Sequence, residues 1–145
     1  MRFVCRAAVV VSMCALACNR PPQTLKAPEF RGSIAGVDWS LMELGGKPAP
    51  TGAGGQRVTI HFDADSGRVF GFAGCNRFAG GYTVEGSNLH FPPLAMTKMA
   101  CTEGMELEQQ FADALIRTNR YEFNAAGLTF FDGSTPVARF TRANQ

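Results

Sequence analysis

One segment of this sequence has the periodicity of an amphipathic helix, and this feature constrains the fold more than any other. Between residues 102 and 117, Leu107, Phe111 and Leu115 recur every four residues, with Ala112 and Ile116 beside them. This spacing gives one apolar stripe along a helix. A lone helix of this kind must bury its stripe against the rest of the chain, so the surrounding segments have to form its partner surface.

The ends of this helix carry their own signals. Thr102 is expected to cap the N-terminus, and Glu103, Glu106 and Glu108 lie toward the positive end of the helix dipole. Arg117 lies toward the negative end. Gly104 is a weak point in the predicted first turn, because glycine disfavours helix.

The segments on both sides of the helix alternate between apolar and polar residues, as half-buried strands do. Before the helix these are residues 38–44, 57–62, 68–74 and the hairpin 81–91, and after it "YEFN", "LTFF" and "VARF". Consecutive strands tend to pair as antiparallel neighbours, which gives about eight strands. We therefore predict an α+β domain: an antiparallel, strongly curved, partly open barrel-like sheet with one packed α-helix.

The N-terminal residues predict export. Arg2 and Arg6 precede a short apolar run, the pattern of a signal peptide, which we assign to residues 1–17. The run is too short to span a membrane. Cys18 follows Ala17 as the lipidated cysteine follows a lipobox, although Leu16 lies one position later than the usual leucine. We expect a lipid attached to Cys18, and ordinary secretion is the alternative.

The residues after Cys18 are polar and rich in proline, which is typical of a flexible tether. We assign residues 18–35 to this tether and residues 36–141 to one folded domain. An aspartate directly after the lipidated cysteine resembles an inner-membrane retention signal of enteric bacteria. In this sequence that position is Asn19. The expected location is therefore the periplasmic face of a bacterial outer membrane, or the periplasm if the chain is not lipidated.

The charge balance excludes two classes of partner. The chain has 14 Lys and Arg against 12 Asp and Glu, and removal of Arg2 and Arg6 with the leader leaves these numbers equal. A protein that binds nucleic acid or an anionic membrane surface needs a basic surplus or stripe. We expect no nucleic-acid partner, a membrane contact through the lipid anchor, and a monomer.

Two cysteines remain in the predicted domain. Cys5 and Cys14 lie in the leader and Cys18 would carry the lipid, which leaves Cys75 and Cys101. In an exported domain an even number of cysteines favours a disulfide. Two free buried thiols, or a catalytic thiol at Cys75, are the alternatives.

The stretch "GCNRFAGGY", residues 74–82, has the composition of a rigid corner. Asn76 can adopt left-handed backbone or bond to its own turn. Arg77 and Asn76 are the possible binding residues. The Arg77 guanidinium offers five donors to a carboxylate or phosphate, and an ion pair with a helix glutamate is the alternative. His61 and His90 lack the spacing of metal ligands, so we expect no metal site and no cofactor.

Four segments together resemble the META domain, the family of the bacterial heat-shock protein HslJ: "WSLMEL", "GFAGCNRFAGGYTVEGSNLHF", "MTKMACTEGMELEQQFADAL" and "YEF...LTFFDGSTPVARF". The resemblance implies a lone helix on an antiparallel, barrel-like sheet. It also implies an envelope lipoprotein linked to stress or antibiotic tolerance, without an established chemistry, and it places Cys75 and Cys101 at recurrent cysteines of the family. The architecture is similar to that of pilot lipoproteins, whose cracked barrel holds an acyl chain.

Three functions of different classes follow. A non-enzymatic envelope lipoprotein acting in stress tolerance or assembly by protein binding predicts an apolar patch or groove at one mouth of the sheet. A carrier of an acyl chain or small apolar ligand predicts a lined cavity between helix and sheet. An enzyme predicts a cleft with a base and an oxyanion donor. The sequence supplies no such catalytic constellation, so we expect a protein that is not an enzyme.

Overall fold

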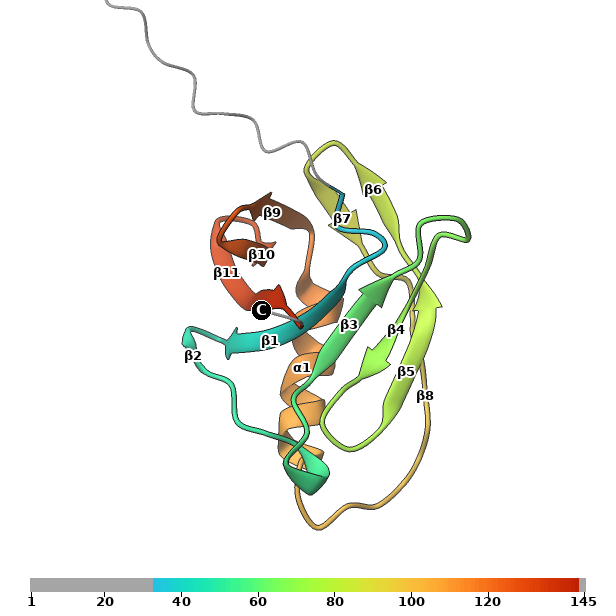
Figure 1. The fold of residues 1–145 in the computed structure, drawn as a ribbon, viewed down its shortest axis with the longest axis vertical. Coiled ribbons are helices and arrows are strands. Elements are labelled where there is room, and N and C mark those ends of the chain that lie inside the picture. The colour runs from blue at the N-terminus through green and yellow to red at the C-terminus, as the bar shows by residue number, and fades with distance from the viewer. Residues whose placement is uncertain (1–32, 144–145) are drawn as a thin grey trace, which may run out of the picture.

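The computed structural model describes residues 33–143, so the predicted leader, Cys18 and most of the predicted tether lie outside the described residues. One helix packs against a strongly curved sheet of mostly antiparallel strands (Figure 1). The predicted α+β class, with a partly open barrel-like sheet and one packed helix, is confirmed.

The elements follow one another along the chain as a long run of strands, one helix and three further strands. They are β1 (Asp38–Leu44), β2 (Lys47–Pro48), a 3-10 turn (Ala53–Gly55), β3 (Thr59–Phe62), β4 (Arg68–Phe72), β5 (Arg77–Gly81), β6 (Thr83–Glu85), β7 (Asn88–His90), β8 (Ala95–Met96), α1 (Met105–Arg117), β9 (Arg120–Asn124), β10 (Gly127–Asp132) and β11 (Thr135–Arg142).

The strands form one sheet in the order β6-β7-β9-β10-β11-β1-β3-β4-β5-β8, with β2 paired to β1 beside this path. Ten strands on the path exceed the predicted number of about eight. The main difference is β5, which the sequence presented as a corner. Phe78 is its only large apolar residue, so alternation could not reveal it, whereas pairing with β4 over five residues makes it a strand.

The sheet does not close into a full barrel. Its terminal strands are β6 and β8, and they are not neighbours in the described part of the sheet. The connection between β7 and α1, residues 91–104, contains β8 and crosses the open side. We call residues 91–104 the crossing segment.

Helix α1 fills the concave side of the sheet. Leu107, Phe111 and Leu115 are buried, as the stripe predicts. The ring of Phe111 lies 5.8 Å from that of Phe78 on β5 and 6.3 Å from that of Phe140 on β11, measured between centroids. Burial of each such side chain contributes about 2–3 kcal/mol, so contacts between the helix and both halves of the sheet stabilise the curvature.

The predicted start of the helix is wrong. The helix begins at Met105, and its N-cap residue is Gly104, with φ of 86° and no side-chain cap. Thr102 lies outside the helix. A Cβ atom on Gly104 would clash with the carbonyl oxygen of Gly74. The glycine that looked like a defect inside a longer helix is therefore the residue that lets the helix start against the sheet.

The end of the predicted tether is packed on the domain. Ile34 is 6 % exposed and belongs to the hydrophobic core. Its carbonyl oxygen accepts a hydrogen bond of 2.9 Å from the indole Nε1 of Trp39, which is fully buried. Residue 34 therefore belongs to the packed domain.

Candidate functional site

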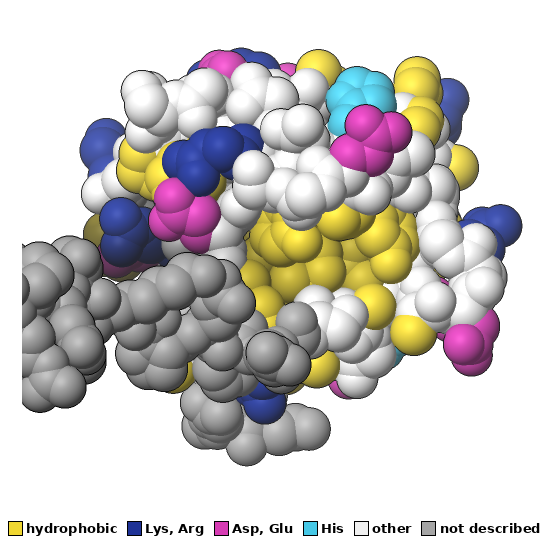
Figure 2. All heavy atoms as spheres, turned by 90° about the horizontal axis from the view of Figure 1, so that it is seen from above, with side chains coloured by type: hydrophobic (Ala, Val, Ile, Leu, Met, Phe, Trp, Pro, Cys, Tyr) yellow, Lys and Arg dark blue, Asp and Glu magenta, His cyan; other side chains and the backbone are white. Residues whose placement is uncertain are grey.

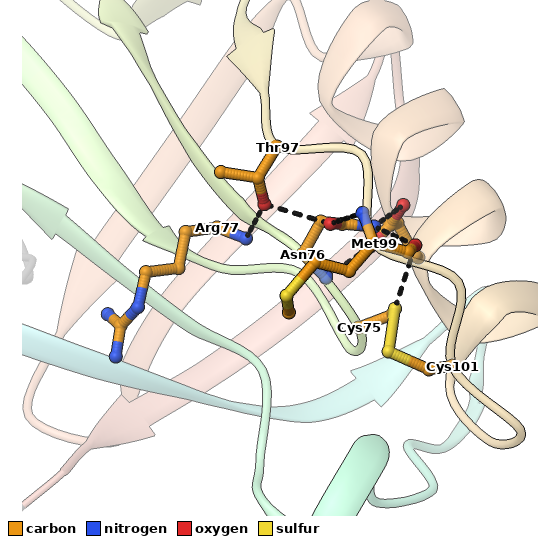
Figure 3. The surroundings of a disulfide bond; sticks show 7 residues. Cys75, Asn76, Arg77, Thr97, Met99 and Cys101 are labelled. Atoms are coloured by element: carbon orange, nitrogen blue, oxygen red, sulfur yellow. Dashed lines mark hydrogen bonds between the residues drawn. A yellow bond between two sulfur atoms is a disulfide. The ribbon is translucent and has the colours of Figure 1, made fainter.

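Every hydrogen-bonding group of the Asn76 side chain has a partner within the protein (Figure 3). Its Nδ2 donates to the carbonyl of Met99 at 3.2 Å and to Oε1 of Glu108 at 3.0 Å. Its Oδ1 accepts from the Thr97 hydroxyl at 2.8 Å and from the Met99 N–H at 2.7 Å. Both donors and both acceptor positions of the amide are therefore occupied. Because Asn76 is also only 2 % exposed, it holds the corner together and leaves no group for a ligand.

The corner is also attached directly to the helix. The backbone N–H of Asn76 donates to Oε2 of Glu108 at 2.5 Å. Left-handed backbone at Asn76 is not used, since no non-glycine residue between 33 and 143 has positive φ. Gly74, with φ of 124°, supplies the unusual conformation, and its position close to Gly104 leaves no room for a side chain.

A disulfide joins this corner to the crossing segment. Cys75 and Cys101 are bonded, with their Cα atoms 5.9 Å apart. Cys75 is 1 % exposed. The sequence left open a disulfide, two free buried thiols or a catalytic thiol at Cys75. The structure contains the disulfide, so neither cysteine has a free thiol in this state.

The corner formed by residues 73–77 thus holds two segments at once. Glu108 connects it to α1, while Thr97, Met99 and Cys101 connect it to the crossing segment. These two segments are the walls of an apolar groove on the open side of the sheet. The corner therefore joins the crossing segment to the first turn of α1, beside the residues that line the groove.

The apolar groove has a volume of about 440 Å³. One wall is residues 90–94 together with Met96, and the other is Ala112, Leu115 and Ile116 of α1. Ile116 is 72 % exposed, although a large aliphatic side chain on a helix that faces the protein is normally buried. Apart from His90, every residue that lines the groove has an apolar side chain. Such a surface favours an apolar ligand.

A second hollow lies on the outer face of β4, β5 and β8. It has a volume of about 450 Å³ and is lined by apolar residues such as Phe70, Ala79 and Ala95, together with Arg77 and Thr97. Phe70 is 43 % exposed. The guanidinium of Arg77 extends away from Asn76 and the disulfide (Figure 3). No ion pair of Arg77 occurs within residues 33–143; a pair with a helix glutamate is thus not formed. We call this surface the outer hollow.

Hydrophobic side chains also gather at the end of the molecule where β6 and β7 lie. Viewed from this end, they line a hollowed area that polar and charged side chains surround (Figure 2). A binding protein is expected to carry an apolar surface of this kind at one mouth of its sheet.

The structure does not bring the two histidines together. Nδ1 of His61 lies 2.7 Å from Oδ1 of Asp38, and its ring stacks on Phe70 at 4.8 Å. His90 borders the apolar groove instead. In the part of the chain that the structure describes, no group of three or more His, Cys, Asp or Glu side chains is placed to hold a metal ion.

Two groups near the turn between β3 and β4 have shifted pKa values. Hydrogen bonds from the Ser66 hydroxyl and backbone N–H lower the pKa of the Asp63 carboxyl. Burial raises the pKa of Tyr82, and the charge of Asp63 adds to this. The Tyr82 hydroxyl, kept protonated, donates to the Asp63 carbonyl oxygen at 3.3 Å. Both shifts therefore accompany a hydrogen-bonded turn, and neither Asp63 nor Tyr82 lines the groove.

The sequence identified the corner and predicted an apolar groove or cavity for a binding function, but it did not indicate which residues line it. It assigned the helix to core packing alone, yet Ile116 faces solvent. The sequence did contain one signal for the groove, which is the width of the apolar stripe. Leu107, Phe111 and Leu115 pack against the sheet. Ala112 and Ile116 widen the stripe on one side, and these two residues line the groove. The prolines at 92 and 93 marked the opposite wall, because they prevent that stretch from joining a central strand.

Helices that are long and apolar enough to cross a membrane do not occur among residues 33–143. The sequence from residue 32 to 145 matches a family model described as the META domain. A search of curated proteins finds no match.

Two solved structures have a similar fold. One is an NMR structure of a protein from Burkholderia xenovorans, with a TM-score of 0.63 and 23 % identity, covering 77 % of this chain and 85 % of that chain. The other is an NMR structure with a TM-score of 0.58 and 24 % identity, covering 74 % of this chain and 90 % of that chain. At this identity the likeness concerns the fold alone.

Proposed function

This chain belongs to the META domain family, and from this premise we propose that it is a non-enzymatic cell-envelope protein that binds an apolar segment of another protein. The observation that carries the proposal is the apolar groove between the crossing segment and α1. A role in envelope assembly or stress tolerance would be exerted through that partner. The fold itself does not specify the partner.

The exposed side chain of Ile116 supports protein binding in particular. Water contact with a large aliphatic side chain costs free energy that burial in an interface recovers. Hydrogen bonds and a disulfide join the two segments that carry the groove walls, at Met99 and Cys101 of the crossing segment and at Glu108 of α1. Both segments are therefore held in the fold before a partner arrives. A preformed site loses less conformational entropy on binding.

The proposed location depends on the N-terminal residues. The signal-like residues 1–17 and Cys18 support export and lipid attachment, with the outer membrane or periplasm as destination. The disulfide between Cys75 and Cys101 supports an oxidising compartment. A lipid anchor would hold the domain near envelope proteins.

The absence of a catalytic role is part of the same proposal. Among the described residues, Cys75 and Cys101 are bonded to each other, and His61 is paired with Asp38 on an outer face. A nucleophile with an adjacent base is therefore not assembled around either cysteine.

A second candidate function is the carriage of an acyl chain or another small apolar ligand. The groove favours this candidate because its lining is apolar with a single histidine. An acyl chain is apolar along its length, so an apolar lining that removes it from water is sufficient to bind it. The two candidates differ in what contacts Ile116 in the cell.

Photo-crosslinking from the groove distinguishes the two. A photoreactive amino acid replaces Ile116 in the full chain in its own cells, and in a matched strain it replaces Lys47, which is exposed on β2. A protein adduct specific to position 116 supports protein binding. An adduct with the mass of a lipid supports the carrier. Equal labelling at both positions would overturn a binding function of the groove.

A further inference from the structure

Strand β8 has a free backbone edge within residues 33–143. It is the terminal strand of the described sheet and pairs there with β5 alone, with Ala95 opposite Ala79 and Met96 opposite Phe78. The N–H of Thr97 donates to the carbonyl of Arg77 at 3.0 Å. In an antiparallel ladder, alternate residues direct both backbone groups toward the same neighbour. Because Thr97 faces β5, Met96 directs its N–H and C=O away from it.

An apolar hollow lies on each face of this edge. The outer hollow is on the side of Ala95, and the apolar groove is on the side of Leu94 and α1. Met96 borders both. Successive side chains of an extended chain point to opposite faces. A strand placed beside Met96 would therefore direct alternate side chains into the two hollows.

The ionisable side chains around the edge of β8 are basic. The linings of the two hollows contain Arg77 and His90 as their ionisable side chains and no carboxylate. Lys98 is exposed just after β8. The Arg77 guanidinium has no ion pair with any other residue that the structure describes, so it is suited to a carboxylate, which it can bind through two donors. The complementary strand therefore carries Asp or Glu on the side of the outer hollow.

The edge is also limited in length. β8 spans two residues, and Pro92 and Pro93 precede it. Prolines donate no ladder hydrogen bond and protect sheet edges against open-ended pairing. A single short strand fits this edge, whereas repeated edge-to-edge association does not.

From these observations we infer that the protein partner binds as a short extended strand added to the free edge of β8. Its apolar side chains fill the apolar groove and the outer hollow alternately, and an acidic side chain pairs with Arg77. Main-chain hydrogen bonds and pockets for alternate side chains are the combination used in β-strand addition. This inference rests on the proposed function and names the form of its ligand.

The first test selects the ligand. A phage-displayed library of short linear random peptides is panned on the exported full-length chain with Cys18→Ser, which cannot be acylated. Selected sequences are expected to alternate apolar residues and to include Asp or Glu. Each selected peptide is then synthesised with and without N-methyl groups on alternate backbone amides. The N-methyl groups remove strand pairing and keep every side chain.

N-methylation on the pairing face should weaken binding about tenfold, since the peptide loses the amide that donates to the Met96 carbonyl and the methyl group occupies the space where the strands pair. The Met96 amide should become protected against hydrogen exchange when the unmodified peptide binds. Arg77→Gln should weaken binding about fivefold. Arg68→Gln is the matched control, because Arg68 is exposed on β4 and lines neither hollow; it should leave binding unchanged.

Three results would overturn the inference. Equal binding of the N-methylated peptide would show that side chains alone enter the groove. Failure to select any peptide, combined with a protein adduct at position 116, would reject the strand and leave the proposed function standing. Concentration-dependent protection of the Met96 amide without peptide would identify a second copy of this chain as the occupant.

Discussion

At the scale of single residues, Asn76 has the largest structural role in the site. One amide connects the β4–β5 corner to the crossing segment through Met99 and Thr97, and to α1 through Glu108. The sequence identified Asn76 as a turn residue, which is a local property. Its partners lie between 21 and 32 positions away in the chain, so no local pattern could have named them.

Replacement of Asn76 tests this role. Asn76→Ala leaves the Met99 N–H and Oε1 of Glu108 without their side-chain partner, while the backbone N–H of residue 76 still donates to Oε2 of Glu108. The change should lower the free energy of unfolding by about 2–4 kcal/mol. Urea denaturation measures the loss. Asn124→Ala is the control, because Asn124 is exposed and accepts one turn hydrogen bond from the Ala126 N–H; it should cost less than about 1 kcal/mol.

A second pair of variants makes the test specific. Asn76→Asp places a carboxylate against Glu108 and should also destabilise the protein. Adding Glu108→Gln restores a donor between the two side chains and should recover part of the loss in a double-mutant cycle. Additive effects of the two changes would contradict a direct interaction.

At the scale of elements, the start of α1 is set by a contact with the sheet and not by a capping side chain. Gly104 has φ of 86° and lies against the Gly74 carbonyl. The sequence predicted a start at Thr102 because threonine is a good cap in isolation. The close approach of two backbones overrides that local preference.

Substitution of this glycine follows from the geometry. Gly104→Ala introduces a Cβ atom where the Gly74 carbonyl lies, in addition to the unfavourable left-handed backbone, so it should cost at least about 3 kcal/mol. Gly133→Ala provides the comparison, since Gly133 has φ of 59° with nothing within 4 Å of the added atom. That control should cost about 1–2 kcal/mol. Thermal and urea unfolding of both variants give the difference, and equal costs would mean that α1 can move away from the corner.

At the scale of the whole molecule, the open side of the sheet is the decisive feature. The terminal strands β6 and β8 do not meet within the described residues, and the crossing segment bridges this side. The disulfide closes a loop that includes β5 to β8. It therefore constrains the same strands whose edges leave the groove accessible.

Removal of the disulfide should affect stability more than fold. With cysteines separated by 26 positions, the double variant Cys75→Ser with Cys101→Ser should lose about 3 kcal/mol by the chain-entropy model. Reduction of the unchanged protein should give a similar loss. Hydrogen exchange should become faster at the backbone of the crossing segment before it does in β10 and β11. A uniform increase throughout the sheet would contradict the local role of the bond.

The sequence by itself determined the fold class, the inward faces of most strands and the pair of cysteines available for a bond. These properties depend on periodicity, turn residues and composition, which are local or additive. The tertiary structure decided that residues 77–81 form a strand, that the helix begins at Met105 after Gly104, and that Asn76 is buried among its own partners. It also decided that Ile116 is exposed and that β8 lies between two hollows. Each of these depends on contacts between segments distant in the chain, where packing and backbone pairing outweigh local preference.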